Sequence, residues 1–293
     1  MTGKSGFVSF VGRPNVGKST LMNALIGEAV AITSSKPQTT RKAIRGIVTR
    51  PSGQLIIVDT PGLHRPRTLL GERLNSLVDQ TLSDVDLIGM CFPADEAIGK
   101  GDRFILEKLS RYPRARLFAI VTKTDLVKNA AVEAKLAEVA TLAGWIGSAS
   151  VRNDSKTELE ALAETLIALM PESPNLYPED ARSDESVEAR IPEIVREAVL
   201  EELDEELPHS LAVTLTDIVT EGKSTKVFVS MIVERDSQKG IIIGKRGSML
   251  RLIGERARPK IEGLLGRSIY LDLHVTVSKD WQRDPKALGR LGF

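Results

Sequence analysis

The fold of this chain is decided by the stretch Gly12-Arg-Pro-Asn-Val-Gly-Lys-Ser-Thr20. It follows an apolar run, Phe7–Val11, and it precedes Leu21–Ile26, whose apolar residues have helical spacing. This is the pattern G-x-x-x-x-G-K-[ST] in its required context of strand, loop and helix. Its two glycines let successive backbone N–H groups converge on phosphates, and the helix N-terminus adds positive charge. The stretch therefore predicts a loop that binds a nucleoside phosphate.

Within this loop, two side chains have specific expected roles. Lys18 would reach the β- and γ-phosphates, and the hydroxyl of Ser19 would bind Mg²⁺. The other loop residues that we expect to contact the nucleotide are Gly12, Asn15, Val16, Gly17 and Thr20.

Length and composition limit the class of protein. A chain of 293 residues with 42% hydrophobic and 27% charged residues has the composition of two folded globular domains. The net charge is only +1, so any nucleic-acid surface must be local. The single cysteine, Cys91, cannot form an intramolecular disulfide. There is no apolar run of about 18 residues and no signal-peptide pattern at the start. We therefore expect the cytoplasm.

The composition of the sequence and its pattern of apolar residues change near residue 172. Before it, short apolar runs alternate with helical patterns, which indicates an α/β domain with a mostly parallel sheet. The strands expected there are Phe7–Val11, Leu55–Val58, Leu87–Phe92, Leu117–Val121 and Trp145–Gly147. Residues 173–188 are rich in proline and polar residues and read as a linker. Residues 189–293 predict a smaller α+β domain. Its expected elements are helix Ile191–Leu207, strands Leu211–Val219 and Thr225–Val233, helix Gly247–Leu265 and strand Ile269–Val277.

Two further motifs would complete the phosphate site. Asp59-Thr-Pro-Gly62 follows an expected strand, where an aspartate can hold the Mg²⁺ shell and a glycine N–H can approach the γ-phosphate. Lys36-Pro-Gln-Thr-Thr-Arg41 lies between these motifs, and we prefer Thr40 over Thr39 as a further Mg²⁺ ligand in a switch loop. A polar turn before a strand remains the alternative for that segment. The expected Mg²⁺ ligands are thus Ser19, Thr40 and Asp59.

The base would be read by the motif Thr122-Lys-Thr-Asp125 and by Ser148-Ala-Ser150. The carboxylate of Asp125 can accept hydrogen bonds from N1–H and N2 of guanine, donors that adenine lacks. The stem of Lys123 can lie along the base, and the N–H of Ala149 can reach guanine O6. The expected base-site residues are Thr122, Lys123, Asp125, Leu126, Ser148, Ala149 and Ser150.

These motifs, in this order and spacing, resemble those of the Ras-like GTPases. The residues within these motifs resemble those of the bacterial Era family in particular: Gly-Arg-Pro-Asn-Val-Gly-Lys-Ser-Thr, Pro-Gln-Thr-Thr-Arg and Asp-Thr-Pro-Gly-Leu-His. The resemblance implies hydrolysis of GTP to GDP and phosphate with Mg²⁺ as cofactor. It assigns the catalytic roles to Lys18, Thr40, Gly62 and Asn15.

The chain departs from the Ras-like pattern in ways that bear on affinity and catalysis. Thr122 replaces an asparagine that braces the base loop, which predicts weaker nucleotide affinity with guanine selectivity intact. Leu63 stands where a water-orienting glutamine is found in Ras. Asn15 is either a potassium ligand, as in related GTPases, or a turn residue. His64 is either a base or a solvated loop residue.

A second cluster of motifs lies in the smaller domain. A G-x-x-G tetrad at Gly244–Gly247 has basic residues at its centre, an apolar run before it and a helical pattern after it. A tight turn with cationic tips between two helices can clamp a nucleotide backbone. The expected RNA-binding residues are Ile241, Ile242, Ile243, Gly244, Lys245, Arg246, Gly247 and Arg251. We expect positive charge to collect around this loop and compensating acid on helix Ile191–Leu207.

The order helix, strand, strand, helix, G-x-x-G, helix, strand resembles a type II KH domain, which favours single-stranded RNA. Together, the resemblances imply a GTPase that binds the 3′ end of small-subunit ribosomal RNA and acts in assembly of that subunit. They also favour a monomer, and contact with a membrane surface stays open. Trp281 in the C-terminal tail could pack on the domain or touch RNA.

Two other functions stay open at this point. One is an RNA-binding assembly protein with a vestigial nucleotide site, for which Thr122 would be the symptom. The other is a P-loop small-molecule kinase, which would need an acceptor site and an arginine-rich lid, and neither is visible.

Overall fold

The computed structural model describes residues 3–33, 40–62, 66, 68–112, 116–203, 210–222 and 224–293. The chain forms two compact units. The first comprises Met1–Ala31, Thr40–Arg65 and Leu74–Asp184, and the second comprises Ile32–Thr39, Pro66–Arg73 and Glu185–Phe293. Thr39, Leu63 and His64, which the sequence singled out, lie outside the described residues.

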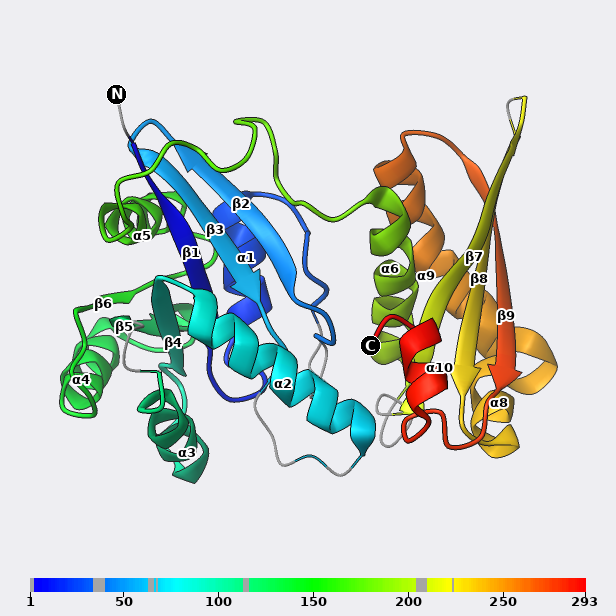
Figure 1. The fold of residues 1–293 in the computed structure, drawn as a ribbon, viewed down its shortest axis with the longest axis horizontal. Coiled ribbons are helices and arrows are strands. Elements are labelled where there is room, and N and C mark those ends of the chain that lie inside the picture. The colour runs from blue at the N-terminus through cyan, green and yellow to red at the C-terminus, as the bar shows by residue number, and fades with distance from the viewer. Residues whose placement is uncertain are drawn as a thin grey trace. The chain divides into compact units, whose positions relative to one another are not determined.

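The first unit is built on a six-stranded sheet with the order β2-β3-β1-β4-β5-β6 (Figure 1). The strands are β1 (Lys4–Val11), β2 (Ile44–Arg50), β3 (Gly53–Asp59), β4 (Leu87–Pro93), β5 (Arg116–Thr122) and β6 (Gly147–Ser150). Only the β2–β3 pair is antiparallel, and the other pairs are parallel. All residues of β3 and β4 are buried, as expected for central strands covered on both faces.

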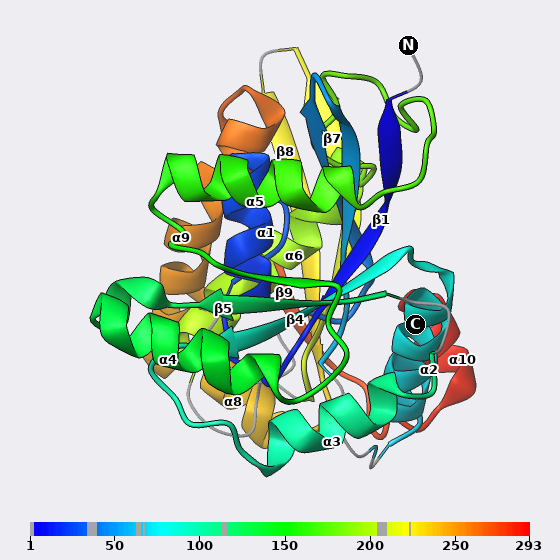
Figure 2. The same cartoon turned by 90° about the vertical axis from the view of Figure 1, so that its left-hand side faces the viewer.

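Helices cover both faces of this sheet (Figure 2). They are α1 (Lys18–Ile26), α2 (Leu69–Asp84), α3 (Lys100–Leu109), α4 (Asn129–Ala140) and α5 (Lys156–Ala168). One core cluster joins the apolar residues of α1 and α5 to one sheet face, and a second joins those of α2, α3 and α4 to the other. The expected α/β layering is therefore confirmed.

The sequence analysis missed β2 and placed the last strand two residues too early. Gly46 lies within β2, and a Cβ there would clash with Ile26 Cδ1, because α1 crosses the strand closely at this point. β6 begins at Gly147, where a Cβ would lie 2.7 Å from the ring of Phe118 on β5. At both positions the glycine permits close packing, and neither marks a break.

The segment after α5 is bound to the first unit. The N–H of Ser5 donates to the carbonyl of Pro171, and the N–H of Ile47 on β2 donates to the carbonyl of Arg182. Arg45 Nη1 lies 2.8 Å from Asp184 Oδ2. We predicted a linker over 173–188, and its part up to Asp184 thus forms backbone hydrogen bonds with the sheet.

The second unit has a three-stranded sheet with the order β7-β8-β9. Its strands are β7 (Ala212–Glu221), β8 (Ser224–Val233) and β9 (Ile269–Val277), with β7 antiparallel and β9 parallel to β8. Its helices are α6 (Val187–Glu202), α8 (Asp236–Ile243), α9 (Ser248–Leu265) and α10 (Pro285–Arg290). A separate core cluster joins α6, α8 and α9 to the sheet. The expected smaller α+β domain is confirmed.

The C-terminal tail packs on this second unit. Trp281 is fully buried, its Nε1 donates to the carbonyl of Ser210 over 3.1 Å, and its ring stacks with Phe293. Of the two alternatives for Trp281, the structure therefore shows packing. Among the described residues, none of the helices combines the length and apolar character needed to span a membrane.

Candidate nucleotide and RNA sites

The loop between β1 and α1 has the backbone conformation of a phosphate cradle. Asn15 and Gly17 adopt left-handed conformations with φ of 64° and 93°, so the chain turns back before α1 begins at Lys18. Gly12 cannot carry a side chain, because a Cβ would lie 2.8 Å from Val16 Cγ2 and 2.9 Å from the carbonyl of Cys91. The turn aims the N-terminus of α1 into the loop, where its partial positive charge favours an anion.

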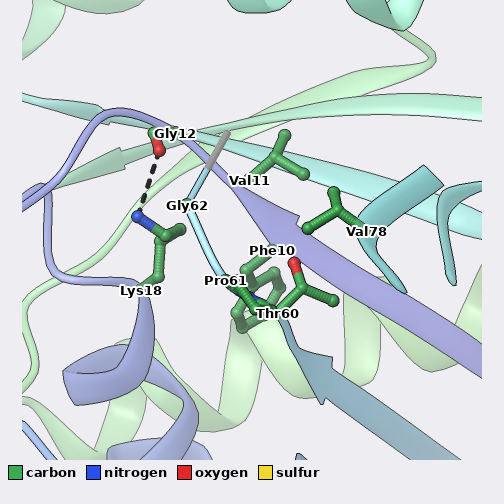
Figure 3. A pocket seen from close by; sticks show the side chains of 8 residues that line it. All are labelled: Phe10, Val11, Gly12, Lys18, Thr60, Pro61, Gly62 and Val78. Carbon is green, nitrogen blue, oxygen red and sulfur yellow. Dashed lines mark hydrogen bonds between the residues drawn. The ribbon is translucent and has the colours of Figure 1, made fainter. Parts of the chain in front are cut away.

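Lys18 occupies the centre of this loop. Its Nζ donates to the carbonyl oxygens of Gly12 (3.1 Å) and Arg13 (2.8 Å). Burial lowers the pKa of Lys18, and the nearby Asp59 and Cys91 oppose that shift. Figure 3 shows its ammonium beside Gly12 and facing Gly62, at the edge of a small pocket whose other walls are mostly apolar. A phosphate beside this ammonium would add negative charge next to the cation and would favour its charged form.

Three oxygen donors converge beside Lys18 in a set that fits Mg²⁺. Asp59 Oδ2 accepts from Ser19 Oγ over 2.8 Å and from Thr40 Oγ1 over 2.9 Å. Its other oxygen, Oδ1, is buried without a hydrogen-bond partner among the described residues. Burial raises the pKa of Asp59, while the Ser19, Lys18 and Thr40 contacts oppose the rise. Hydroxyl and carboxylate oxygens are hard ligands that suit Mg²⁺, and the buried Oδ1, without a hydrogen-bond partner in the ranges that the structure describes, fits a carboxylate that could help hold the ion.

The base motif follows β5 and is connected directly to the phosphate loop. Thr122 is fully buried, and its Oγ1 donates to the carbonyl of Val16 over 2.6 Å. The hydroxyl thus joins the two loops. Asp125 and Leu126 lie in a short 3₁₀ turn, Thr124–Leu126, and are exposed. β6 pairs with β5 and brings Ala149 and Ser150 to the same sheet edge.

The loop expected to bind RNA joins α8 to α9. Gly244, Arg246 and Gly247 all have positive φ, and a Cβ at Gly244 would lie 2.7 Å from that of Met249. Lys245 and Arg246 are exposed at the tip of the turn. These conformations form a tight turn with two cations directed into solvent, as a backbone clamp requires.

One expectation for this domain needs correction. We expected Ile241, Ile242 and Ile243 all to bind RNA, but Ile242 is fully buried in the core of the second unit. Because α8 is helical through this run, successive side chains point in different directions, and only Ile241, at 50% exposure, faces solvent fully.

The compensating acid expected on the helix Ile191–Leu207 is present on α6, where it pairs with part of the positive charge of α9. Arg256 Nη1 lies 2.8 Å from Glu201 Oε2, and Lys260 Nζ lies 2.6 Å from Glu197 Oε2, so α6 neutralises one face of α9. Lys245, Arg246 and Arg251 have no acidic partner within the described part of the chain. The basic surface near the turn is therefore carried by these three residues.

Sequence reasoning missed three charged residues near the nucleotide site, Arg13, Glu96 and Asp102. They form ion pairs with each other and with Lys123. A signal was present, because an arginine at the second position of a phosphate loop, in a chain of low net charge, needs an acidic partner.

Comparisons with known proteins identify a GTPase domain and a KH domain in this chain. Residues 7–124 match the family model described as 50S ribosome-binding GTPase, and residues 206–282 match the KH domain model. The chain is 58% identical to GTPase Era of Leifsonia xyli, over 99% of both chains, and 52% identical to GTPase Era of a Nocardioides species, over 99% of this chain and 96% of that one. The chain belongs to the Era family of GTPases.

Solved structures of the Era family have the same fold over the whole chain. A variant of Aquifex aeolicus Era bound to GDP.AlF4⁻ has a TM-score of 0.93 at 33% identity, covering 99% of each chain. An Era structure with MgGDPNP and nucleotides 1506–1542 of 16S ribosomal RNA has a TM-score of 0.91 at 32% identity, again over 99% of each chain. The predicted pairing of a GTPase domain with a KH domain is confirmed.

Proposed function

We propose that this Era-family GTPase binds GTP and Mg²⁺ at the loop Gly12–Thr20 and hydrolyses GTP to GDP and phosphate there. The observation that carries the proposal is the convergence of Ser19 and Thr40 on the buried carboxylate of Asp59. Mg²⁺ bound by these oxygens would neutralise charge on the β- and γ-phosphates. We retain 1–172 and 189–293 as the proposed domains, joined by 173–188.

Other residues of the chain would supply the remaining interactions with the nucleotide. The buried ammonium of Lys18 stabilises charge that develops on the phosphates in the transition state, where low solvent exposure strengthens the interaction. Gly62 lines the same pocket as Lys18, and its N–H would approach the γ-phosphate. Thr40 lies close to Asp59, so its hydroxyl could also reach a Mg²⁺ held there. Contact with Mg²⁺ and the γ-phosphate would then order the loop that carries this threonine.

We assign guanine selectivity to the carboxylate of Asp125. The N–H of Ala149 would donate a hydrogen bond to guanine O6. The exposed position of Asp125 leaves its carboxylate open to N1–H and N2 of the base. The test is competition for a fluorescent GDP analogue. Unlabelled GTP and GDP should displace it at concentrations at least 100-fold below those of ATP, because adenine would leave the carboxylate unpaired. Equal displacement by ATP would show that the base site is wrongly assigned.

Potassium is a further proposed cofactor. Asn15 is an exposed residue of the phosphate loop with a left-handed conformation (φ of 64°), and its amide oxygen could bind a monovalent cation beside the phosphates. We expect hydrolysis to slow when K⁺ is replaced by Na⁺ at constant ionic strength. An unchanged rate would leave Asn15 as a turn residue.

The KH domain is proposed to hold single-stranded ribosomal RNA at the turn Gly244–Gly247. The likeness to the Era structure solved with a 16S ribosomal RNA fragment supports the 3′ end of small-subunit RNA as the ligand. On this basis we assign the protein to assembly of the small ribosomal subunit. The cytoplasm and a monomeric state are part of the same proposal, and sedimentation of the purified protein tests the latter.

A further inference from the structure

A cluster of charged residues joins the phosphate loop to the base loop in the first unit. It contains Arg13 in the phosphate loop, Asp95 and Glu96 after β4, Asp102 in the first turn of α3, and Lys123 in the base motif. Of these, only Lys123 has a place in the proposed nucleotide site. The other four have charges close to that site, and the roles proposed above use none of them.

Arg13 is fixed by α3. Its Nε donates to Asp102 Oδ1 over 2.9 Å, and the Asp102 side chain is only 1% exposed. The other carboxylate oxygen, Oδ2, accepts from the N–H of Gly99 and so caps the helix. The stem of Arg13 lies against the helix at Gly101, where a Cβ would come within 2.8 Å of Arg13 Cδ. These contacts give the guanidinium one orientation.

Glu96 connects this guanidinium to the base loop. Its Oε2 lies 3.1 Å from Arg13 Nη1, and its Oε1 lies 3.4 Å from Lys123 Nζ. Its backbone is anchored as well, because the Glu96 carbonyl accepts from Lys135 Nζ over 3.0 Å and that lysine also pairs with Glu138. A single carboxylate therefore touches one cation on each of the two loops that would enclose a nucleotide.

We propose that Glu96 is a positioning residue for the guanine nucleotide, and that it holds the phosphate loop and the base loop at the separation that the nucleotide requires. The proposal rests on the nucleotide site proposed above. The hydroxyl of Thr122 makes one connection between the loops, at Val16, and the Arg13–Glu96–Lys123 bridge makes a second. The bridge also fixes the ammonium of Lys123, so its stem is held in place before the base arrives.

The sign of one substitution separates this bridge from a simple charge effect. A nucleotide carries several negative charges, so loss of a nearby carboxylate should tighten binding if only long-range charge mattered. Loss of the bridge should instead weaken binding, because Arg13 and Lys123 would then repel each other and the loops would separate. Asp95 is a matched control, since its Oδ1 lies 3.9 Å from Lys123 Nζ and it forms no ion pair with Arg13.

The experiment measures dissociation of a fluorescent GDP analogue and steady-state GTP hydrolysis by the full chain. Glu96→Gln should release the analogue about fivefold faster, as expected for the loss of two partly exposed ion pairs. It should raise KM while changing kcat by less than about twofold, since the lost interaction acts in binding. Asp95→Asn should release the analogue at the wild-type rate or more slowly. Glu96→Asp keeps the charge but is too short to reach both cations, so it should also release faster.

A double-mutant cycle tests the bridge itself. Arg13→Gln and Glu96→Gln should be non-additive in the dissociation rate, because either substitution alone opens the bridge. Additive effects, or a Glu96→Gln protein that releases no faster than Asp95→Asn, would overturn the inference while the nucleotide site stands. A wild-type chain that fails to bind the GDP analogue would instead refute the proposed site, and the bridge with it.

Discussion

Asp59 carries a charge that is costly when no nucleotide is bound. It is fully buried, one of its oxygens has no hydrogen-bond partner among the described residues, and burial raises its pKa. Because the folded-state pKa lies above the unfolded value, protonation favours the folded state. The contribution of this group to stability is therefore largest below the unfolded pKa and is lost as the pH rises through the folded pKa.

Removing this charge should stabilise the nucleotide-free protein. We expect Asp59→Asn to raise Tm by about 2–4 °C for each kcal/mol by which it increases the free energy of unfolding. The same substitution should abolish the extra stabilisation that Mg²⁺ gives in the presence of GDP. Asp102→Asn is the matched control. That carboxylate is equally buried but pairs with Arg13 and caps α3, so its loss should lower Tm. Scanning calorimetry of the two variants checks both signs, and a lower Tm for Asp59→Asn contradicts the argument.

Thr122 shows how a departure from a family pattern can be compensated. Its hydroxyl donates to the carbonyl of Val16, a contact that holds the base loop to the phosphate loop. Thr122→Val should leave that buried carbonyl without its partner and speed release of GDP about tenfold. Thr122→Asn should slow release, because the amide can donate twice. Stopped-flow release of a fluorescent GDP analogue measures the rates of both variants. Equal rates for the Val variant and wild type would contradict a bracing role for the Thr122 hydroxyl.

At the scale of elements, one buried side chain adds to the backbone hydrogen bonds that hold the segment after α5. Gln54 on β3 is fully buried, and its Nε2 donates to the carbonyl of Tyr177 and to Thr49 Oγ1. Its Oε1 accepts from the N–H groups of Leu176 and Tyr177, each over 2.9 Å. This glutamine thus takes the place of a strand in satisfying the backbone of an irregular segment.

Gln54→Leu should detach that segment, because the two N–H groups would lose their acceptor. We expect the free energy of unfolding to fall by about 2–4 kcal/mol, the cost of several unmade buried hydrogen bonds. Urea unfolding of the full chain measures the loss. Gln80→Leu, at an exposed position of α2, is the control and should change stability by less than about 0.5 kcal/mol. Similar unfolding curves for both variants would show that the segment is held by its other contacts.

The elements that the sequence predicted well were those with a strong local signal. The buried apolar runs of β1, β4 and β5 and the loop before α1 could be located from residue type alone. β2 could not, because Gly46 and two arginines within it read as a break, and its partner contacts come from α1 and β3. Likewise, charge on α9 was visible in the sequence, but its pairing with α6 depends on which helix faces meet. The Arg13–Glu96–Lys123 bridge joins three separate loops, so no single stretch of sequence encodes it.

At the scale of the whole molecule, a nucleotide unit is joined to an RNA unit with little free chain between them. Asp184 is still tied to Arg45 of β2, and Ser186 already caps α6 by accepting from the N–H of Ala189. The two functions of the chain should be measured together in the full-length protein.

RNA binding by the turn Gly244–Gly247 can be distinguished from a general effect of the positive charge on α9. Lys245→Ala with Arg246→Ala should weaken binding of a single-stranded RNA with the small-subunit 3′-end sequence at least tenfold, and should reduce the salt dependence of binding by about one phosphate contact for each cation. Arg256→Ala removes the same type of charge from α9, but that arginine is paired with Glu201, so it should have little effect. Fluorescence anisotropy at several salt concentrations measures both. Equal losses would mean that the whole basic surface, and not the turn, binds RNA.

The nucleotide should control which RNA the full chain retains. With a non-hydrolysable GTP analogue, the loop around Thr40 is expected to be ordered by Mg²⁺ and the γ-phosphate, and with GDP that contact is lost. Crosslinking the protein to cellular RNA in each state, followed by sequencing, should therefore recover the 3′ end of small-subunit ribosomal RNA mainly with the GTP analogue. Asp59→Asn is the control, since without Mg²⁺ binding its recovery should not differ between nucleotides. Random RNA in both states, or equal recovery of the same RNA by the wild type, would leave two activities in one chain with no switch between them.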